Sequence, residues 1–368
     1  MTEKQKSICI LVMTGAALFS LSAWCLIKPA DRYSDSERRA LAAMPEFTAE
    51  SVLSGTFMSD FEEYAADQFP LRDRFRTLKA VTELKLFHKL DNNGIYTADE
   101  HLSKLEYPMN TQMLDHAAER FSWIYDTYLK ETDTNLYFSI IPDKNKFLAN
   151  EHDVLSMDYD AFAEYMKEKT DYMEYIDIYD MLAADDYYMT DTHWRQECIV
   201  DFAEKLANAM GISVHAEFRE NISTTPFCGV YCGQSALDFP PDTLKYLTNE
   251  VLDSCIVTSY DTGKPVQVPL YDMAAAAGKD PYEMFAGGSD ALVTIENPDA
   301  DTERELILFR DSFGSSIAPL FMAGYSKVTL VDIRYIQSSM LGQFIEFDDQ
   351  DVLFLYSTLL LNNSMGMR

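Results

Sequence analysis

A short apolar run that leads directly into a serine places the strongest constraint on how this chain can fold. Residues 306–309 (Leu-Ile-Leu-Phe) have the length and composition of a buried strand. Arg310, Asp311 and Ser312 follow at once, and residues 313–322 form an apolar stretch with a helical pattern. A serine at such a strand-to-helix turn lies at the top of the sheet, where the strand ends, beside the first N–H groups of a helix. This geometry suits a nucleophile whose oxyanion is bound by those N–H groups.

The serine alone has a second interpretation, because serine also favours the N-cap of a helix. A serine hydroxyl is a poor nucleophile at neutral pH. The catalytic interpretation therefore needs an imidazole to take its proton and a carboxylate to fix the imidazole tautomer.

Residues 191–194 (Asp-Thr-His-Trp) supply both groups. His193 is the candidate base, and Asp191, two residues earlier, is the candidate orienting carboxylate. The chain order Asp, His, Ser is allowed because triads are defined by geometry and not by sequence order. We therefore predict a triad of Ser312, His193 and Asp191. The alternative is that Asp191 caps a helix expected over residues 194–210 and that His193 is a satisfied core residue.

These two segments together resemble the DHHW family, which is similar to the SGNH-hydrolase-like alginate O-acetyltransferases. Residues 310–316 (Arg-Asp-Ser-Phe-Gly-Ser-Ser) are similar to the Gly-Asp-Ser block of SGNH enzymes, with Arg310 in place of the glycine. The acid–histidine block precedes the serine block, as in the circularly permuted alginate enzymes. Where the family name has its first histidine, this chain has Thr192. Further matches are residues 68–72 (Gln-Phe-Pro-Leu-Arg), 229–231 (Gly-Val-Tyr) and 285–289 (Phe-Ala-Gly-Gly-Ser).

The resemblance implies an SGNH-like three-layer α/β/α sandwich with a mainly parallel sheet and a circularly permuted motif order. Strands that alternate with helices in the C-terminal half point to the same fold class. The resemblance also implies an O-acetyltransferase that modifies an extracellular polysaccharide through an acyl-enzyme on Ser312, with a membrane acyltransferase partner supplying acetyl groups. A carbohydrate esterase with the same triad, a non-catalytic carbohydrate-binding protein and a structural envelope protein are the alternatives. No cofactor and no metal site is expected.

Four more residues are candidates for contact with the substrate or the oxyanion. Residues 135–141 form the most apolar strand pattern of the N-terminal half, and ligands in open α/β sheets collect beyond the carboxyl ends of strands. Lys144 and Asn145 follow this strand, although a solvated loop is the alternative. Tyr231 is a candidate for lining the cleft, and Arg310 lies next to the nucleophile in sequence.

Residues 8–27 are apolar and carry no charge. Twenty such residues match the roughly 30 Å hydrocarbon core of a bilayer. Lys4 and Lys6 precede them, which predicts a cytoplasmic N-terminus and an extracytoplasmic remainder. We expect residues 1–30 to be an uncleaved membrane anchor and residues 31–368 to form the extracytoplasmic domain. A cleaved signal segment is the alternative.

Composition excludes some partners. The 368 residues carry a net charge of −30, which makes nucleic acid an unsuitable partner and disfavours docking on anionic lipid headgroups. Cysteines outside the N-terminal segment fit either a disulfide or free buried thiols; they are Cys198, Cys228, Cys232 and Cys255.

Residues 52–90 have helical periodicity, with five aromatic residues as predicted core contacts: Phe57, Phe61, Tyr64, Phe69 and Phe75.

Overall fold

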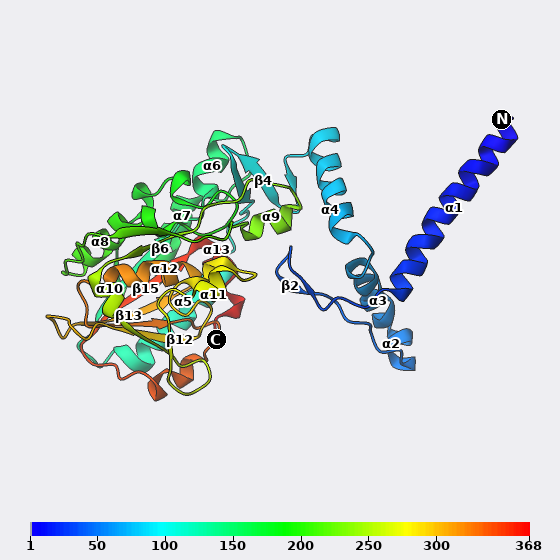
Figure 1. Cartoon of the computed structure of the whole chain (residues 1–368). Coiled ribbons are helices and arrows are strands. Elements are labelled where there is room, and N and C mark those ends of the chain that lie inside the picture. The colour runs from blue at the N-terminus through cyan, green and yellow to red at the C-terminus, as the bar shows by residue number, and fades with distance from the viewer. Residues whose placement is uncertain (1) are drawn as a thin grey trace. The chain divides into compact units, whose positions relative to one another are not determined.

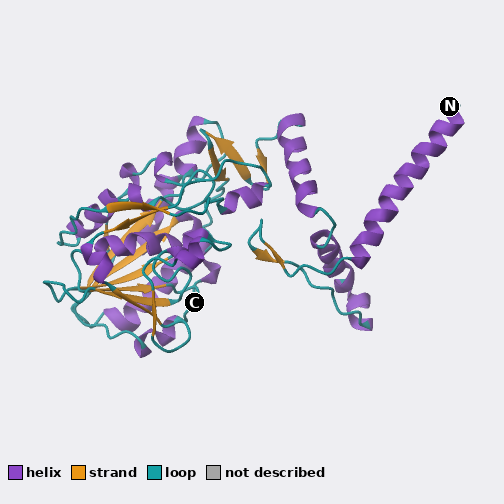
Figure 2. Cartoon of the chain, viewed as in Figure 1, coloured by secondary structure: helices purple, strands orange, loops and turns teal. Residues whose placement is uncertain are grey.

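The computed structural model describes residues 2–368. The chain divides into two compact units, and each is described by itself. Unit 1 comprises Met1–Asn93 and Cys232–Asp238, and unit 2 comprises Gly94–Tyr231 and Phe239–Arg368. Figure 1 traces the whole chain from the N-terminus to the C-terminus, and Figure 2 separates its helices, strands and loops. Helix α9 (Val230–Ser235) crosses the sequence boundary between the two units.

Unit 1 consists of helices and very short strands. Its elements are α1 (Glu3–Ile27), β1 (Tyr33–Ser34), β2 (Arg39–Ala40), α2 (Ala49–Ser54), α3 (Thr56–Asp67), α4 (Arg72–Val81) and β3 (Asp91–Asn92). Helix α4 continues as a π-helical turn, Thr82–Leu86. The helical segment predicted over residues 52–90 is interrupted, since α3 ends at Asp67 and Leu71 has a left-handed backbone (φ 59°) before α4 begins.

Helix α1 contains the apolar segment expected from the sequence. Over Glu3–Cys25 it is long and apolar enough to cross a membrane, and it is the one helix within residues 2–368 with that property. A signal sequence near the N-terminus would have the same length and composition. A capping box opens the helix, because Thr2 Oγ1 accepts from the Gln5 N–H and the Gln5 side chain accepts from the Thr2 N–H.

The predicted aromatic core of residues 52–90 is wrong. Phe61, Phe69 and Phe75 are 37–44% exposed, and Phe57 and Tyr64 are only partly buried. The helical period was identified correctly, but a period cannot show that a second layer lies against the apolar side. Unit 1 supplies little such cover for these rings. Several of them contact one another instead, as Phe57 and Phe61 do with ring centroids 5.9 Å apart.

Unit 2 is organised around an eight-stranded sheet with the strand order β11-β10-β12-β14-β13-β15-β6-β7. Neighbouring strands from β14 to β7 are parallel, whereas β11, β10, β12 and β14 pair antiparallel. The strands are β6 (Asn135–Ile141), β7 (Glu174–Tyr175), β10 (Ile256–Ser259), β11 (Val266–Val268), β12 (Leu292–Glu296), β13 (Glu305–Arg310), β14 (Lys327–Val331) and β15 (Asp351–Ser357). This mixed, mostly parallel sheet confirms the predicted α/β class.

Helices cover both faces of this sheet. Side chains alternate between the faces along each strand, so Leu306 and Leu308 of β13 join one apolar cluster while Ile307 and Phe309 join the other. The first cluster includes side chains of α8 (Val200–Ala209) and α12 (Ser312–Ile317). The second includes side chains of α5 (Thr111–Ile124) and α7 (Tyr159–Lys169). Two buried cores therefore hold β13 in the middle of the sheet.

The other elements of unit 2 are short. They are β4 (Ile95–Ala98), β5 (His101–Lys104), β8 (Arg219–Ile222), β9 (Lys245–Thr248), α6 (Asn145–Glu151), α10 (Glu250–Ser254), α11 (Met273–Ala276) and α13 (Thr358–Leu361). The helix expected over residues 194–210 begins later than predicted. A 3-10 turn, Gln196–Cys198, comes first, and α8 starts at Val200. The cause is an isolated β-bridge between Tyr187 and Trp194, which holds Trp194 in an extended segment.

Candidate active site

Ser312 lies at the carboxyl end of the central strand β13, as predicted. It is the first residue of α12, and the preceding Asp311 is the N-cap. One carboxylate oxygen of Asp311 accepts from the Phe313 N–H at 3.0 Å. The other accepts from the N–H (2.9 Å) and the hydroxyl (2.6 Å) of Ser357, which ends the neighbouring strand β15. Asp311 therefore fixes the serine turn to two adjacent strands and leaves the Ser312 hydroxyl available for another partner.

That partner is His193. The His193 Nε2 atom lies 2.7 Å from Ser312 Oγ, and its Nδ1 atom lies 2.6 Å from Asp191 Oδ1. In the sequence, Ser312 is 119 residues after His193, and Asp191 is 2 residues before it. Asp191 is 1% exposed and His193 9% exposed, while Ser312 is partly exposed. The structure thus brings the three predicted residues into one hydrogen-bonded chain with the acid buried and the serine accessible.

Asp191 is held by its own loop and by the first N–H group of α9. Its Oδ1 atom also accepts from the His193 N–H at 3.1 Å, and its Oδ2 atom accepts from the Val230 N–H at 2.8 Å. Because α8 begins only at Val200, the alternative role of Asp191 as a cap for that helix is excluded. Gly229 lies so close that a Cβ atom built on it would be 2.4 Å from the Asp191 Cβ. A glycine is therefore required for this approach.

Asp242 supports the same loop from the other side. Its carboxylate accepts from the N–H groups of Met189 (2.7 Å) and Thr190 (2.8 Å) and from the Thr190 hydroxyl. Thr190 Oγ1 in turn accepts from the Gly229 N–H at 2.8 Å. Asp242 could not be identified from the sequence, because an isolated aspartate in a loop carries no pattern that points to a partner 52 residues away.

The imidazole of His193 has a second neighbour that sequence reasoning also missed. The ring of Tyr282 stacks on it with centroids 3.8 Å apart and planes 7° apart. The Tyr282 hydroxyl donates to Ser316 Oγ (2.7 Å), which also accepts from the Trp194 indole N–H (2.9 Å). Burial raises the pKa of Tyr282 well above its usual value, so its hydroxyl stays protonated.

Lys144 and Asn145 lie beyond the end of β6 as predicted, but both are fully buried. The Lys144 ammonium donates to the carbonyl oxygens of Tyr188 (2.7 Å) and Met189 (3.1 Å). The Asn145 amide donates to Ser156 and Tyr159. Through these contacts the polar atoms of both side chains hold segments of unit 2 together. Because both residues are buried, the alternative of a solvated loop is wrong for each of them.

Arg310 and Tyr231 are also buried. The Arg310 guanidinium donates to the carbonyl oxygens of Gly288 (3.1 Å) and Asp290 (3.2 Å) and pairs with Asp332 at 3.4 Å. The Tyr231 ring lies 5.1 Å from the Lys144 ammonium. Arg310 thus ties the serine turn to the loop before β12, and Tyr231 covers the lysine.

One buried carboxyl group lies near these residues. Burial, and next the charge of Glu106, raise the pKa of Asp143 to about 6. Three exposed side chains elsewhere, Asp99, Glu151 and His152, bring ligand atoms within 4.8 Å of one another. None of these three belongs to the hydrogen-bonded chain of Ser312, and exposed acidic groups of this kind do not by themselves make a metal site.

Comparison with known proteins supports the fold. No family model and no curated protein matches the sequence. A DHHW family protein from Eubacterium siraeum is 18% identical over 75% of this chain and 95% of that chain, with a TM-score of 0.59. PatB1 of Bacillus cereus, in a structure with a sulfonyl adduct, is 19% identical over 73% and 95%, with a TM-score of 0.57.

A weaker match is the O-acetyltransferase domain of Pseudomonas putida AlgJ, which is 13% identical over 73% of this chain and 92% of that chain. Its TM-score of 0.42 is too low to bear on function. The two stronger matches show that the chain has the fold of a DHHW family protein and of PatB1.

Proposed function

We propose that this protein is a serine-dependent O-acetyltransferase that acts on an extracytoplasmic polysaccharide. The observation that supports the proposal most is the hydrogen-bonded chain Asp191–His193–Ser312, with distances of 2.6 and 2.7 Å. The shared fold with a DHHW family protein and PatB1 is consistent with it. The acetyl group and the polysaccharide acceptor are proposed because the sequence resembles the alginate O-acetyltransferases.

In the first half-reaction, Ser312 Oγ attacks the carbonyl carbon of an acetyl donor while His193 Nε2 takes the serine proton. A tetrahedral oxyanion forms and then collapses as the donor's leaving group departs with the proton from His193. The product is an acetyl ester on Ser312. The carboxylate of Asp191 keeps the proton of neutral His193 on Nδ1, so that Nε2 is free to accept.

In the second half-reaction, a sugar hydroxyl gives its proton to His193 Nε2 and attacks the acetyl ester. The Ser312–acetyl bond breaks, and the proton returns to Ser312 Oγ. The Ser312 N–H lies at the start of α12, where the first N–H groups of a helix have no partner within the helix, and we assign it to the oxyanion. If water replaces the sugar hydroxyl, the same steps make an esterase.

Helix α1 is assigned as an anchor that keeps unit 2 on the extracytoplasmic side. Its length and composition support this assignment, as do Lys4 and Lys6 before its apolar part. We include a membrane acyltransferase as the partner that supplies acetyl groups, because Ser312 needs an acetyl donor on the extracytoplasmic side of the membrane.

The test is acetyl-ester turnover by the full chain in detergent, with Ser312→Ala beside the unchanged protein. Loss of the nucleophile should lower kcat by at least roughly 10⁴-fold. Ser326→Ala is the matched control, because that hydroxyl lies outside the site and donates to the Arg304 carbonyl oxygen. A sulfonyl fluoride should label Ser312, as identified by peptide mass spectrometry, and should not label the Ser312→Ala protein.

Added oligosaccharides then separate the two reactions. Acetylated oligosaccharide marks a transferase, whereas free acetate alone marks an esterase. Turnover and labelling that survive in Ser312→Ala would refute the nucleophile assignment. If the unchanged protein binds oligosaccharide but reacts with neither an acetyl ester nor a sulfonyl fluoride, the protein is a carbohydrate-binding module.

A further inference from the structure

One part of this acidic chain is positively charged. Residues 71–90 contain six basic and two acidic side chains, a net charge of +4, although the whole chain carries −30. Arg74, Lys85 and Lys89 are exposed. Surface charges farther away than about 8–10 Å are screened at physiological ionic strength, so the local charge governs what this segment binds.

The same segment exposes large apolar side chains. Leu71, Phe75 and Leu78 follow one another at helical spacing and are 53%, 44% and 60% exposed. Leu86, the last residue of the π-helical turn, and Phe87 after it are 68% and 66% exposed. A helix with an apolar stripe flanked by cations is the type that lies in the interface of an anionic bilayer.

The start of this segment is tied to the end of α1. The Gln68 side chain accepts from the Asp31 N–H and donates to the Asp31 carbonyl oxygen, both at 2.8 Å. Asp31 is four residues beyond the last residue of α1, which limits its distance from that helix to roughly 14 Å. Gln68 in turn is four residues before α4. If α1 crosses a membrane, residue 71 therefore lies near the membrane surface.

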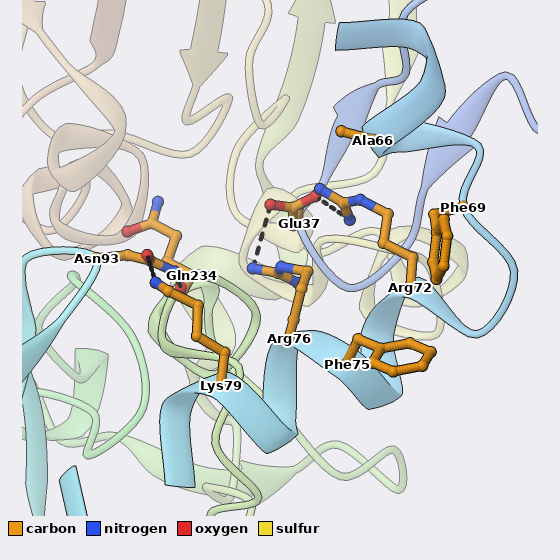
Figure 3. A pocket seen from close by; sticks show the side chains of 9 residues that line it. All are labelled: Glu37, Ala66, Phe69, Arg72, Phe75, Arg76, Lys79, Asn93 and Gln234. Carbon is orange, nitrogen blue, oxygen red and sulfur yellow. Dashed lines mark hydrogen bonds and ion pairs between the residues drawn. The ribbon is translucent and has the colours of Figure 1, made fainter. Parts of the chain in front are cut away.

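A pocket of about 650 Å³ opens beside α4 (Figure 3). Arg72, Arg76 and Lys79 line it together with the rings of Phe69 and Phe75. Glu37, the one carboxylate among the residues that line the pocket, bridges the two arginines at 2.5 and 3.1 Å. Three further carboxylates lie 3.3–3.7 Å from these cations, outside the pocket lining: Asp67, Asp73 and Glu83. The lining itself sets cations next to aromatic rings, which matches an anionic headgroup joined to an apolar tail.

We propose that residues 71–90 dock on the surface of an anionic phospholipid bilayer. In the docked state Leu71, Phe75, Leu78, Leu86 and Phe87 enter the headgroup region, and the basic side chains contact lipid phosphates. The pocket of Figure 3 receives a headgroup at the edge of this contact. The docked segment adds a second contact between unit 1 and the lipid surface, and 44 residues separate α4 from α1.

Hydrogen–deuterium exchange of the full chain in lipid nanodiscs tests this proposal without any assay of activity. Peptides from residues 71–90 should exchange more slowly in phosphatidylglycerol nanodiscs than in phosphatidylcholine nanodiscs. At 1 M salt, where screening acts within about 3 Å, the difference should shrink. Arg74→Gln with Lys85→Gln should lower the ratio of docked to undocked segment about five-fold for each cation removed.

Lys205→Gln with Lys264→Gln is the matched control, because it removes two exposed lysines from unit 2. This control should retain the full difference between the two lipids. Equal exchange in both lipids and in detergent would overturn the proposal. Protection that persists in detergent would show that another part of the chain covers this surface, and it would overturn the proposal as well.

Discussion

The ring of Tyr282 lies flat on the imidazole of His193, 3.8 Å from centroid to centroid. In the proposed reaction this imidazole becomes positively charged each time it holds the serine proton. An aromatic face attracts a cation by about 0.5–2 kcal/mol, so Tyr282 stabilises the charged form of His193 in the transition state. The ring also prevents the imidazole from turning away from Ser312.

Replacing this ring should affect kcat more than KM. Tyr282→Leu removes the stacked face, and we expect kcat to fall roughly 3- to 30-fold with KM nearly unchanged. Tyr282→Phe keeps the ring and removes only the hydrogen bond to Ser316, so kcat should stay within a few-fold. Steady-state kinetics on an acetyl ester give both values. Equal losses in the two variants would show that the hydroxyl matters and the stacking does not.

Asp191→Asn tests the orienting carboxylate. The amide is similar in shape, but it favours the wrong imidazole tautomer, so kcat should fall roughly 10⁴-fold with little change in the fold. Circular dichroism checks the fold. Combined with Ser312→Ala, the substitution should add almost no further loss, because residues that act as one unit are not additive. A further large loss in the double variant would argue against a shared mechanism.

Gly229→Ala should disturb the acid without touching the serine. The new Cβ would lie 2.4 Å from both the Asp191 Cβ and the Thr190 carbonyl oxygen. The loop must move, at a cost of roughly 1–3 kcal/mol in the free energy of unfolding, and activity should fall with it. Thermal unfolding and ester turnover measure the two effects. Gly366→Ala is the control, since nothing lies within 4 Å of its added Cβ.

Asp143 should make stability depend on pH. Its pKa of about 6 lies above the usual 3.8, so the folded chain binds more protons than the unfolded chain between these values. The contribution of this group to stability is therefore complete below about pH 4 and is lost as the pH rises through 6. Its size is on the order of 2–3 kcal/mol. Asp143→Asn should flatten this part of the profile, as followed by denaturant unfolding between pH 4 and 7. An unchanged slope would show that other groups set it.

Local sequence patterns predicted the elements that carry the site. Residues 135–141 and 306–309 were predicted as strands and lie in β6 and β13 of the structure, and the helical pattern after Ser312 was also correct. Buried strands have a distinctive composition, and a serine between strand and helix leaves few arrangements. The pairing of Ser312 with His193 was predicted from chemical need, since an activated serine requires a base.

What the sequence could not show depends on contacts between distant residues. Tyr282 and Asp242 carry no local signal, because their roles arise only when loops from different parts of the chain meet. The late start of α8 has the same origin, since a bridge to Tyr187 overrides the helical tendency of residues 194–199. Phe69 and Phe75 show the converse, because an apolar period predicted burial for side chains that are 37% and 44% exposed.

Trp194 joins the two halves of the proposed triad. Its indole N–H donates to the Phe313 carbonyl oxygen (3.2 Å) and to Ser316 Oγ (2.9 Å). Trp194 follows the base directly, and Phe313 follows the nucleophile directly, so a displacement of one backbone is transmitted to the other. In the proposed reaction, this link keeps the distance between base and nucleophile constant while the surrounding loops differ.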